Sequence, residues 1–428
     1  MKVEATSKSL VSSAPAKTKP TLVGVAKSVF PDAFGGISRG VFEIANRLSD
    51  RGYSTVLLHL EKRDSRAYPQ WRFVSEAYVR STLLKFLPGD LHLAVEALIR
   101  YVGIGKKPCS QVLLSFHLLA GLLCSLRGSR SGVPIISFFA APGFLDWLSE
   151  KTNAIPANSS SLYLILHRIR LAIGCRILRF LEHVALRYSS RILALSRYSF
   201  SAIEQYYPDV LYKSRVCYWG VDTETFRPAR DSDEKRISRV RLGISTDGMV
   251  VACVRRLIPR MGVDLLLEAF SILSTRLDGA ILLIAGDGPM RESLERRASE
   301  LSCCERIIFL GAIPEDLLPS FYRAADVCVL PSLELEGLGL VTLESLACGV
   351  PVVGTSVGGI REVLSEVDPR CLVSTPDPAA VAGSLLEILT LPERERRLLI
   401  EKGYEVIRKL FAWDGTVNGI ETCIRELS

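Results

Sequence analysis

Short β-branched apolar runs alternate with amphipathic stretches from residue 21 almost to the end of the chain. Strands of a parallel sheet are buried on both faces and read as continuous apolar runs, whereas the helices between them carry one apolar face. We therefore expect an α/β protein with two doubly wound, Rossmann-like domains that face a central cleft. The pattern predicts six strands in each domain: TLVGVAKSVF, STVLLHL, VLLSFH, PIISFFA, RILALS and SRVCYW, then MVVACVRRL, AILLIAG, RIIFLG, VCVLPS, PVVGTS and RCLVS.

Two polar segments divide the chain. Residues 1–20 are rich in Ser, Ala, Lys and Pro, which predicts a disordered tail. The stretch VDTETFRPARDSDEKRISRVR combines a proline with mixed charges, as linkers between domains do. We accordingly expect a first domain over residues 21–222 and a second over 223–410.

Composition and charge exclude several classes of protein. With 48% hydrophobic and 23% charged residues, the chain is neither disordered nor fibrous. Its net charge of +7 favours anionic ligands or an anionic membrane, but it lacks the dense basic clusters of nucleic-acid-binding proteins, so no nucleic acid partner is expected. The eleven cysteines are scattered and lack the spacing of a zinc site. They are typical of free thiols in a reducing compartment, which predicts a cytoplasmic location.

The segment LYLILHRIRLAIGCRILRFL at residues 162–181 predicts a long apolar helix threaded with arginines. Between residues 155 and 200 there are seven arginines and a single acid, Glu182. Such a helix suits the surface of an anionic membrane, which suggests peripheral attachment to the inner membrane face. Alternatively, it packs on the sheet while its arginine stems cover apolar surface. The arginines concerned are Arg168, Arg170, Arg176 and Arg179.

Glu336 and Glu344 stand eight residues apart around Gly337 and Gly339, in otherwise apolar company. Because a solvated helical face repeats its charges at three or four residues, this pair predicts a ligand or a buried partner. We expect a helix to begin near Gly339, with Glu344 in its second turn. The glycines admit a phosphate to the positive end of that helix, whereas carboxylates accept hydrogen bonds from sugar hydroxyls. A phosphate flanked by polyols describes a nucleotide sugar.

Cationic side chains gather after the first predicted strand of the second domain, where VRRLIPRMG contains Arg255, Arg256 and Arg260. A departing nucleoside diphosphate gains negative charge, which fixed cations stabilise in the transition state. The stretch AGDGP at residues 285–289 adds a glycine turn after the next strand. By itself, such a turn is more typical of ordinary turn chemistry than of a ligand site.

Taken together, these motifs resemble the GT4 family of retaining glycosyltransferases, whose fold is GT-B. The resemblance covers most of residues 21–428, and its 309–353 block is highly specific. It implies that the segment 411–428, from Trp413 onward, forms a helix that crosses back to the first domain. The matching segments are FGGISRGVFEIANRLSDRGYSTVLL from 34, RILALSRYSFSAI from 191, YWGVDTETFRP from 218, RRLIPRMGVDLLLEAF from 255, LLIAGDGPMRESLE from 282, FLGAIPEDLLPSFYRAADVCVLPSLELEGLGLVTLESLACGVPVV from 309 and GGIREVL from 358.

The resemblance also implies roles for individual residues. Glu336 would bind hydroxyls of the donor sugar, Glu344 the nucleotide ribose, and Arg256 the diphosphate. The loop of the first domain would close over the donor, and one strand end of the second domain would lie beside the nucleobase. The further donor contacts implied are Gly35, Gly36, Leu310, Gly311, Ile313, Gly337, Leu338, Gly339, Leu340 and Val341.

Met261 departs from the family pattern, because the family usually has a lysine five residues after the diphosphate-binding arginine. Methionine does not pair with a phosphate. We expect the neighbouring Arg260 to supply the lost charge, with a solvated loop arginine as the alternative.

Ala140 is a second departure, at a place where a related subgroup has a histidine thought to contact the donor sugar. Pro142 and Asp146 keep the remaining spacing, so Asp146 is an acceptor-side candidate. His117, at the end of the predicted strand VLLSFH, is another, although a lone histidine there is more often structural.

The mechanism implied is retaining transfer of a hexosyl group from a UDP- or GDP-linked sugar to an acceptor hydroxyl. The acceptor would attack from the face that the diphosphate leaves, and a diphosphate oxygen would accept its proton. The acceptor would be a glycan, a polysaccharide or a lipid-linked saccharide. Protein cations would hold the leaving charge, so no metal or other cofactor is expected.

Three alternatives remain open at this point. Glu336 is a carboxylate and is therefore also a conceivable nucleophile. The departures at Ala140 and Met261 suggest a catalytically impaired nucleotide-sugar-binding partner protein. A nucleotide-sugar epimerase on the same fold is the third.

Overall fold

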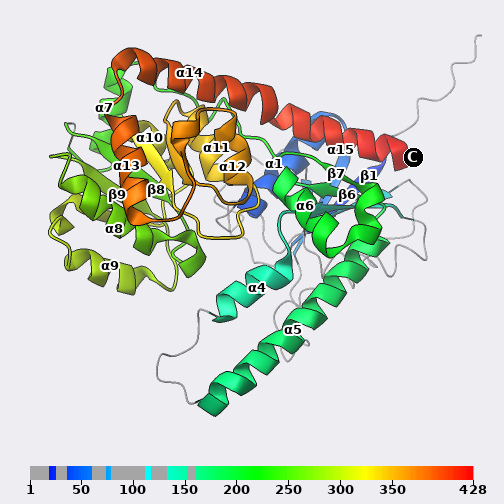
Figure 1. Ribbon diagram of the computed structural model, residues 1–428. Coiled ribbons are helices and arrows are strands. Elements are labelled where there is room, and N and C mark those ends of the chain that lie inside the picture. Colours follow the sequence, from blue (N-terminus) through cyan, green and yellow to red (C-terminus); the bar gives the residue numbers. More distant parts are fainter. Residues whose placement is uncertain are drawn as a thin grey trace, which may run out of the picture.

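The computed structural model describes residues 19–25, 36–59, 74–78, 111–116, 133–152, 161–245 and 247–427. Within them lie two separate sheets, one to each domain (Figure 1). The first sheet contains, in spatial order, β3 (Val74–Tyr78), β2 (Ser54–His59), β1 (Thr21–Val25), β4 (Gln111–Ser115), β5 (Ile135–Phe139), β6 (Arg191–Ala194) and β7 (Ser214–Val216). The second contains β10 (Ile307–Gly311), β9 (Ile281–Ala285), β8 (Val250–Val254), β11 (Val327–Leu330), β12 (Val352–Thr355) and β13 (Leu372–Val373).

Both sheets have the order of a doubly wound fold. All of their strand pairings are parallel. The strand order reverses between β1 and β4 in the first sheet and between β8 and β11 in the second. Ligands bind beyond the carboxyl ends of the strands at such switch points. The predicted α/β class with two Rossmann-like domains is confirmed.

The strand count predicted for the first domain is wrong, because its sheet has seven strands where we expected six. The strand that the sequence analysis missed is β3, VSEAY, which pairs with β2. Ser75 and Glu76 interrupt its apolar pattern, and an edge strand needs less continuous apolar sequence than a central one. All six strands expected in the second domain are present.

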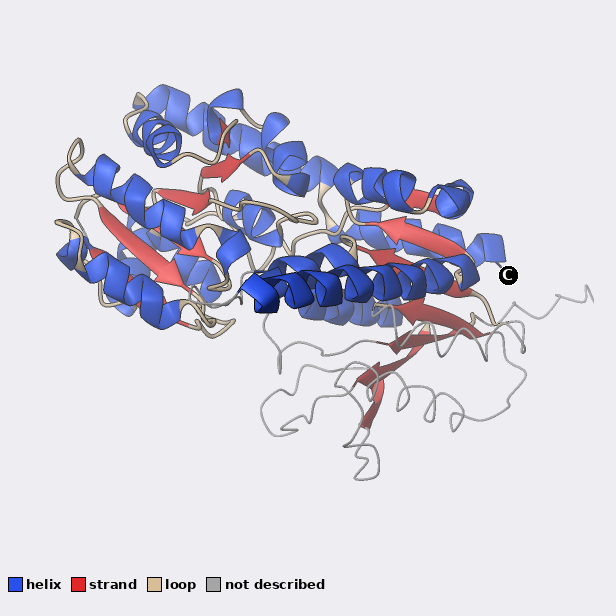
Figure 2. Cartoon of the chain, turned by 60° about the horizontal axis from the view of Figure 1, so that its bottom comes forward, coloured by secondary structure: helices blue, strands red, loops and turns tan. Residues whose placement is uncertain are grey.

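Helices flank the strands of both sheets, as Figure 2 shows. The first domain contributes α1 (Gly36–Asp50), α4 (Gly143–Thr152), α5 (Ser161–Tyr188) and α6 (Arg197–Tyr206). The second contributes α7 (Ser232–Arg241), α8 (Val263–Ser274), α9 (Arg291–Ser299), α10 (Leu318–Ala324), α11 (Leu340–Ala347), α12 (Gly358–Ser365) and α13 (Pro378–Leu389). The chain ends with α14 (Glu393–Leu410) and α15 (Trp413–Leu427).

The two crossings between the domains lie side by side. Val221 and Ala412 form an isolated parallel β-bridge, and the Val221 amide donates to the Phe411 carbonyl at 2.9 Å. Beyond this point α15 lies against the first domain, in line with α14 along one edge of the molecule (Figure 1). Arg51, at the end of α1, binds Asp414 at 3.0 Å and Glu421 at 2.7 Å. The last helix therefore ties the second domain back to α1.

The start of the chain lies outside the described residues, except for Lys19 and Pro20 at the end of the expected tail. Lys19 donates a hydrogen bond to the Arg51 carbonyl, and its ammonium lies 4.6 Å from the centre of the Tyr53 ring. Lys19 at least is therefore held on the first domain.

Helix α5 is 28 residues long and lies with α4 below the strands of the first sheet in Figure 1. Six of its large apolar side chains are 52–64% exposed: Ile165, Leu166, Ile169, Ile173, Ile177 and Phe180. No helix in the described part of the chain has both the length and the apolar character to cross a membrane. The alternative, in which this helix packs its apolar residues on the sheet, is therefore wrong for these six.

Candidate functional site

Arg255 and Glu336 meet at the switch point of the second sheet. Arg255 follows β8, Glu336 lies in the segment after β11, and these two strands are neighbours. Nη2 of Arg255 donates to Oε2 of Glu336 at 2.7 Å and also to the Ser332 hydroxyl. The two charged side chains are only 5% and 14% exposed, respectively. Each therefore depends on the other, since burying an unpaired charge is costly.

The backbone on both sides of Glu336 is fixed by close contacts. Leu335 has a φ of 54°, which is rare for a branched residue, and its carbonyl accepts a hydrogen bond from Arg260 at 3.0 Å. The Gly359 amide donates to the Glu336 carbonyl at 2.9 Å. A Cβ on Gly358 would lie 1.9 Å from that same carbonyl oxygen, so only glycine fits there. The loop from 358 thus holds Glu336 in place.

The helix predicted near Gly339 is confirmed. Gly339 caps α11 with a φ of 75°, and Glu344 lies in its second turn. The Glu344 side chain is 6% exposed, and Oε2 accepts a hydrogen bond from the Tyr322 hydroxyl at 2.7 Å. Burial raises the pKa of Glu344, although the nearby guanidinium of Arg39 opposes this shift.

Arg39 reaches Glu344 from the first domain. It lies one turn into α1, and Nη1 of its guanidinium pairs with Oε1 of Glu344, while Nη2 pairs with Glu315. The guanidinium also lies 5.2 Å from the centre of the Phe226 ring. α1 is set closely in place, because a Cβ on Gly40 would lie 2.1 Å from the Trp219 ring.

Backbone glycines of the predicted site lie where the domains touch. A Cβ on Gly36 would be 3.1 Å from the Leu340 side chain, and one on Gly337 would be 3.3 Å from the Ala140 Cβ. The Ser196 hydroxyl, in the first domain, donates to the Gly337 carbonyl at 2.6 Å. The place of the missing family histidine is therefore next to Gly337.

Glu362 of α12 provides another contact between the domains. Its carboxylate accepts from the amides of Arg197 and Tyr198, at 2.9 and 2.6 Å, where α6 begins. A carboxylate at a helix N-terminus is favourable, because the first amides there have no partners within the helix. The Tyr218 hydroxyl donates to the same carboxylate at 3.0 Å, and burial, together with the charge of Glu362, raises the pKa of Tyr218 to about 12.

The predicted cations behave differently from one another. Arg256 is exposed, and its side chain forms no hydrogen bond or ion pair with any residue of the described ranges. Arg260 is buried and pairs with Asp146 of α4 at 2.9 Å, across the domain boundary. Met261 is buried in the apolar core, so its side chain points away from a charged ligand. The alternative of a solvated loop arginine at 260 is therefore wrong, whereas the expectation that Arg260 supplies charge to a ligand stays a prediction.

The glycine turn after β9 supports the arginine loop. A Cβ on Gly286 would lie 1.8 Å from the Arg255 carbonyl, and one on Gly288 would lie 2.5 Å from the Leu257 carbonyl. Gly286 also donates its amide to the Gly311 carbonyl at 2.7 Å, at the end of β10. These glycines permit close packing between loops, as ordinary turn chemistry predicts.

The remaining predicted donor contacts are dispersed around these residues. Leu338 is buried, while Leu310, Ile313, Leu340 and Val341 pack on the core from partly exposed positions. Gly35 and His117 lie outside the described residues.

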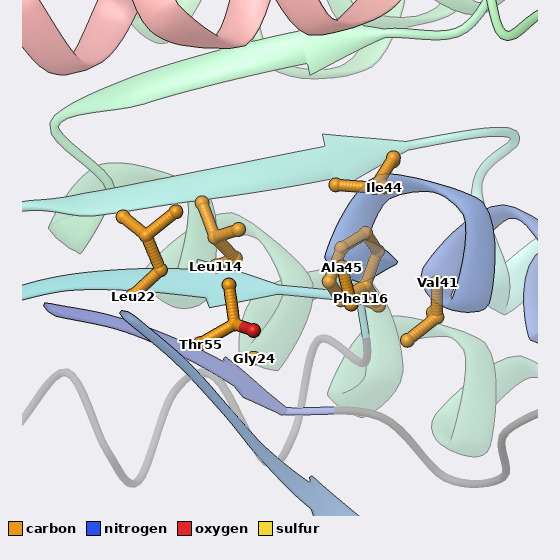
Figure 3. A pocket seen from close by; sticks show the side chains of 8 residues that line it. All are labelled: Leu22, Gly24, Val41, Ile44, Ala45, Thr55, Leu114 and Phe116. Carbon is orange, nitrogen blue, oxygen red and sulfur yellow. The ribbon is translucent and has the colours of Figure 1, made fainter. Parts of the chain in front are cut away.

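None of these charged residues lines the apolar pocket in Figure 3. Its eight lining residues come from α1, from the strands β1, β2 and β4, and from the residue after β4, and Thr55 of β2 supplies the polar side chain among them. Over the part of the chain that the structure describes, no cluster of His, Cys, Asp or Glu has the makings of a metal site. Metal independence stays a prediction.

Sequence reasoning missed three partners of the predicted glutamates. Arg255 was noted as a cation but not as the partner of Glu336. Arg39 and Tyr322 were not singled out, although Arg39 lies three residues after the glycine pair of the first loop. An arginine in that position was the available signal.

Comparison with known proteins gives matches in both sequence and structure. The family described as Glycosyl transferases group 1 matches residues 234–406. The D-inositol 3-phosphate glycosyltransferase of Acidothermus cellulolyticus is 30% identical over 404 residues, which cover 90% of this chain and 84% of that protein. A GDP-mannose-dependent alpha-(1-6)-phosphatidylinositol monomannoside mannosyltransferase of Mycolicibacterium smegmatis is 39% identical over 181 residues. That match covers 41% of this chain and 47% of that protein, so the chain spans about half the length of the mannosyltransferase.

Two solved structures show the same fold. Sucrose-phosphate synthase of Thermosynechococcus elongatus superimposes with a TM-score of 0.75 and 20% identity, covering 96% of this chain and 99% of that one. HepE of Anabaena, in complex with UDP and glucose, gives a TM-score of 0.71 and 17% identity, covering 95% and 100%. At these identities the likeness concerns the fold.

Proposed function

The chain belongs to the glycosyl transferases group 1 family, as its resemblance to GT4 predicted, and we propose that it moves a hexosyl group from a nucleotide sugar to an acceptor hydroxyl with retention. The observation that carries this proposal is the convergence of Glu336, Glu344 and the start of α11 at the boundary between two Rossmann-like domains. Carboxylates that accept hydrogen bonds from hydroxyls, beside amides that donate hydrogen bonds to a phosphate, suit a nucleotide sugar.

The chemistry of each group supports a division of roles. The Arg256 side chain is exposed and has no hydrogen-bond or ion-pair partner among the described residues, so its charge is available to a diphosphate. Glu336 is held by Arg255, and its other carboxylate oxygen can receive sugar hydroxyls. As the bond between the sugar and the diphosphate breaks, Arg256 and the amides of α11 stabilise the negative charge that grows on the diphosphate. A diphosphate oxygen then accepts the proton of the acceptor hydroxyl. Glu336 then binds the sugar rather than forming a covalent intermediate.

Arg260 acts differently in this scheme. Because it pairs with Asp146 and with the Leu335 carbonyl, its charge is already neutralised in part. We propose that it holds the domains together around the reacting sugar. Metal independence is a further part of the proposal, since protein cations take the place of a divalent ion.

The acceptor is proposed to be a glycan or a lipid-linked saccharide. Two matching relatives are named for the glycosylation of inositol 3-phosphate and of phosphatidylinositol monomannoside, respectively, which makes polyol and lipid-linked polyol acceptors the first to test. A cytoplasmic location is proposed because every cysteine that the structure describes is a free thiol, and seven of them are buried.

Peripheral contact with an anionic membrane is proposed for α5. Its exposed apolar residues recur at three or four positions, so they form one stripe along the helix. Exposed arginines Arg168, Arg170, Arg176 and Arg179 accompany this stripe, while Glu182 is buried against α4 and Tyr207. An apolar stripe with flanking cations suits the boundary between headgroups and acyl chains of anionic lipids.

Sedimentation with vesicles tests this contact. The protein should sediment with vesicles that contain phosphatidylglycerol and remain in solution with neutral phosphatidylcholine vesicles. Replacing the four arginines by glutamine should abolish sedimentation, because each is worth about 1 kcal/mol near such a surface. Unchanged sedimentation after all four replacements would contradict the proposal.

Transfer itself is tested by incubating the protein with UDP-, GDP- and ADP-linked hexoses and with phosphatidylinositol or inositol phosphate acceptors, in the presence of EDTA. The expected result is a glycosylated acceptor whose anomeric configuration, read by NMR, equals that of the donor. An inverted product, or a requirement for a divalent ion, would contradict the retaining, metal-independent mechanism. Turnover of any donor would exclude an inactive binding protein.

A further inference from the structure

Arg39 covers the carboxylate that the donor ribose needs. The Glu344 side chain is 6% exposed, with Tyr322 on one carboxylate oxygen and Arg39 on the other. Arg39 is itself 16% exposed, and it comes from the other domain. A ribose therefore has no room to bring two hydroxyls to Glu344 while the guanidinium stays in place.

We propose that Arg39 is a placeholder for the donor: it occupies the ribose position on Glu344 in the donor-free protein, and ribose hydroxyls displace it. The inference rests on the proposed function, because it takes Glu344 as the ribose-binding group. It adds a residue that sets donor affinity by competing with the donor.

The surroundings of Arg39 allow such an exchange. Its second amino group pairs with Glu315, and its guanidinium carbon lies 5.2 Å from the centre of the Phe226 ring. Both partners remain when Glu344 changes its ligand, so the guanidinium keeps a neutralising carboxylate and a nearby aromatic ring after displacement. Glu344 in turn exchanges one charged partner for two hydroxyl donors, and its carboxylate never remains buried and unpaired.

Only the molecules in which Glu344 is free can bind the donor, so the apparent donor affinity is the intrinsic affinity multiplied by that fraction of molecules. Removing the guanidinium should therefore tighten donor binding, which is opposite to the effect of removing a residue that contacts the donor. The sign of the change separates the two roles. Arg47 provides a matched control, because it lies two turns further along α1 and pairs with Glu43 at 3.1 Å.

The experiment is calorimetric titration of the full-length protein with UDP, GDP and ADP. For the diphosphate that binds best, Arg39→Met should lower the Kd about tenfold, corresponding to the loss of one charge-assisted hydrogen bond. Arg47→Met should leave the Kd within about twofold of the wild-type value, as expected for a surface pair. The same diphosphate without its 2′ and 3′ hydroxyls should show no gain, because it offers Glu344 no hydroxyls.

Arg39→Lys is a second variant that keeps the test possible if Arg39→Met does not fold. A lysine keeps the charge but cannot bridge two carboxylates with a planar fork, so an intermediate gain in affinity is expected. If the wild type binds a diphosphate and both variants bind it equally or more weakly, the placeholder is wrong while the donor site stands. If neither the wild type nor any variant binds a diphosphate, the proposed function fails together with this inference.

Discussion

Glu336 and Glu344 are held in opposite ways. Glu336 pairs with Arg255 of its own domain, through two neighbouring strands and a loop that fixes its backbone. Glu344 pairs with Arg39 of the other domain, through a contact that exists only while the domains touch. The Glu336 carboxylate is therefore held by residues of one domain, whereas the environment of the Glu344 carboxylate depends on contact between the two domains.

This difference suggests that the two carboxylates have different roles in the site. A carboxylate fixed within one domain keeps its geometry through every opening and closing, which suits a group that must be preorganised for the transition state. A carboxylate that exchanges partners across the boundary suits recognition of the substrate that binds between the domains. The following predictions test this division, beginning with the largest effect.

Substitution of Glu336 should affect the rate of transfer, whereas substitution of Glu344 should affect donor binding. We expect Glu336→Ala to lower kcat about 100-fold, a loss typical of one preorganised group in an active site. Glu344→Gln should mainly raise the KM for the donor, about tenfold. Steady-state kinetics with the identified donor checks both, and Glu334→Ala, in the same segment, is the control. A loss of kcat that is larger for Glu344 than for Glu336 would reverse the division.

Arg255 and Arg256 are adjacent in sequence but should respond differently to the same change. Arg255→Met leaves Glu336 without its charged partner, so we expect the free energy of unfolding to fall by about 3 kcal/mol. Arg256→Met removes an exposed side chain and should change it by less than about 0.5 kcal/mol while weakening nucleotide binding. Urea denaturation measures the first effect and calorimetry the second. Equal destabilisation by the two variants would show that the buried pair does not fix Glu336.

The burial of Glu344 should appear as a dependence of stability on pH. Its pKa is raised above the ordinary 4.5 by burial, so over the interval from 4.5 to the folded pKa the unfolded chain releases a proton that the folded protein retains. Wild-type stability therefore falls as the pH rises through this interval, and Glu344→Gln lacks that loss. Urea unfolding at a series of pH values should show the variant gaining stability relative to the wild type as the pH rises.

A control variant sharpens this result. Because Arg39 lowers the pKa of Glu344, Arg39→Met should extend the interval of falling stability to higher pH. A relative stability of Glu344→Gln that instead decreases with rising pH would mean that Arg39 outweighs burial.

The smallest expected effect concerns Glu362, which also binds across the boundary. Burial makes the largest contribution to the raised pKa of Tyr218, about 12, and Glu362 adds to it. Glu362→Gln should therefore lower this pKa by part of the shift. NMR titration of labelled tyrosines, with Tyr218→Phe to assign the signal, gives the measurement. An unchanged midpoint would show that Glu362 and Tyr218 do not interact in solution.

Local sequence predicted some of these features and not others. The strands of the second domain and the start of α11 were accessible, because apolar runs and Gly339 act through neighbouring residues. The pairing of Arg255 with Glu336 spans 81 residues and follows from strand order, which periodicity does not reveal. The pairing of Arg39 with Glu344 spans 305 residues and depends on how two domains pack. The strand β3 was missed because Ser75 and Glu76 break its apolar run.

The most direct test of the account is thermal stabilisation by nucleotides in the presence of EDTA. UDP, GDP, ADP and their hexose conjugates are compared on the wild type, on Arg256→Met and on Glu344→Gln. One nucleotide series should raise the melting temperature, with about 2.7 kcal/mol of stabilisation at a hundredfold excess over Kd, and both substitutions should diminish the shift. A shift that survives both substitutions would place the nucleotide elsewhere, and no shift with any nucleotide would contradict the donor site.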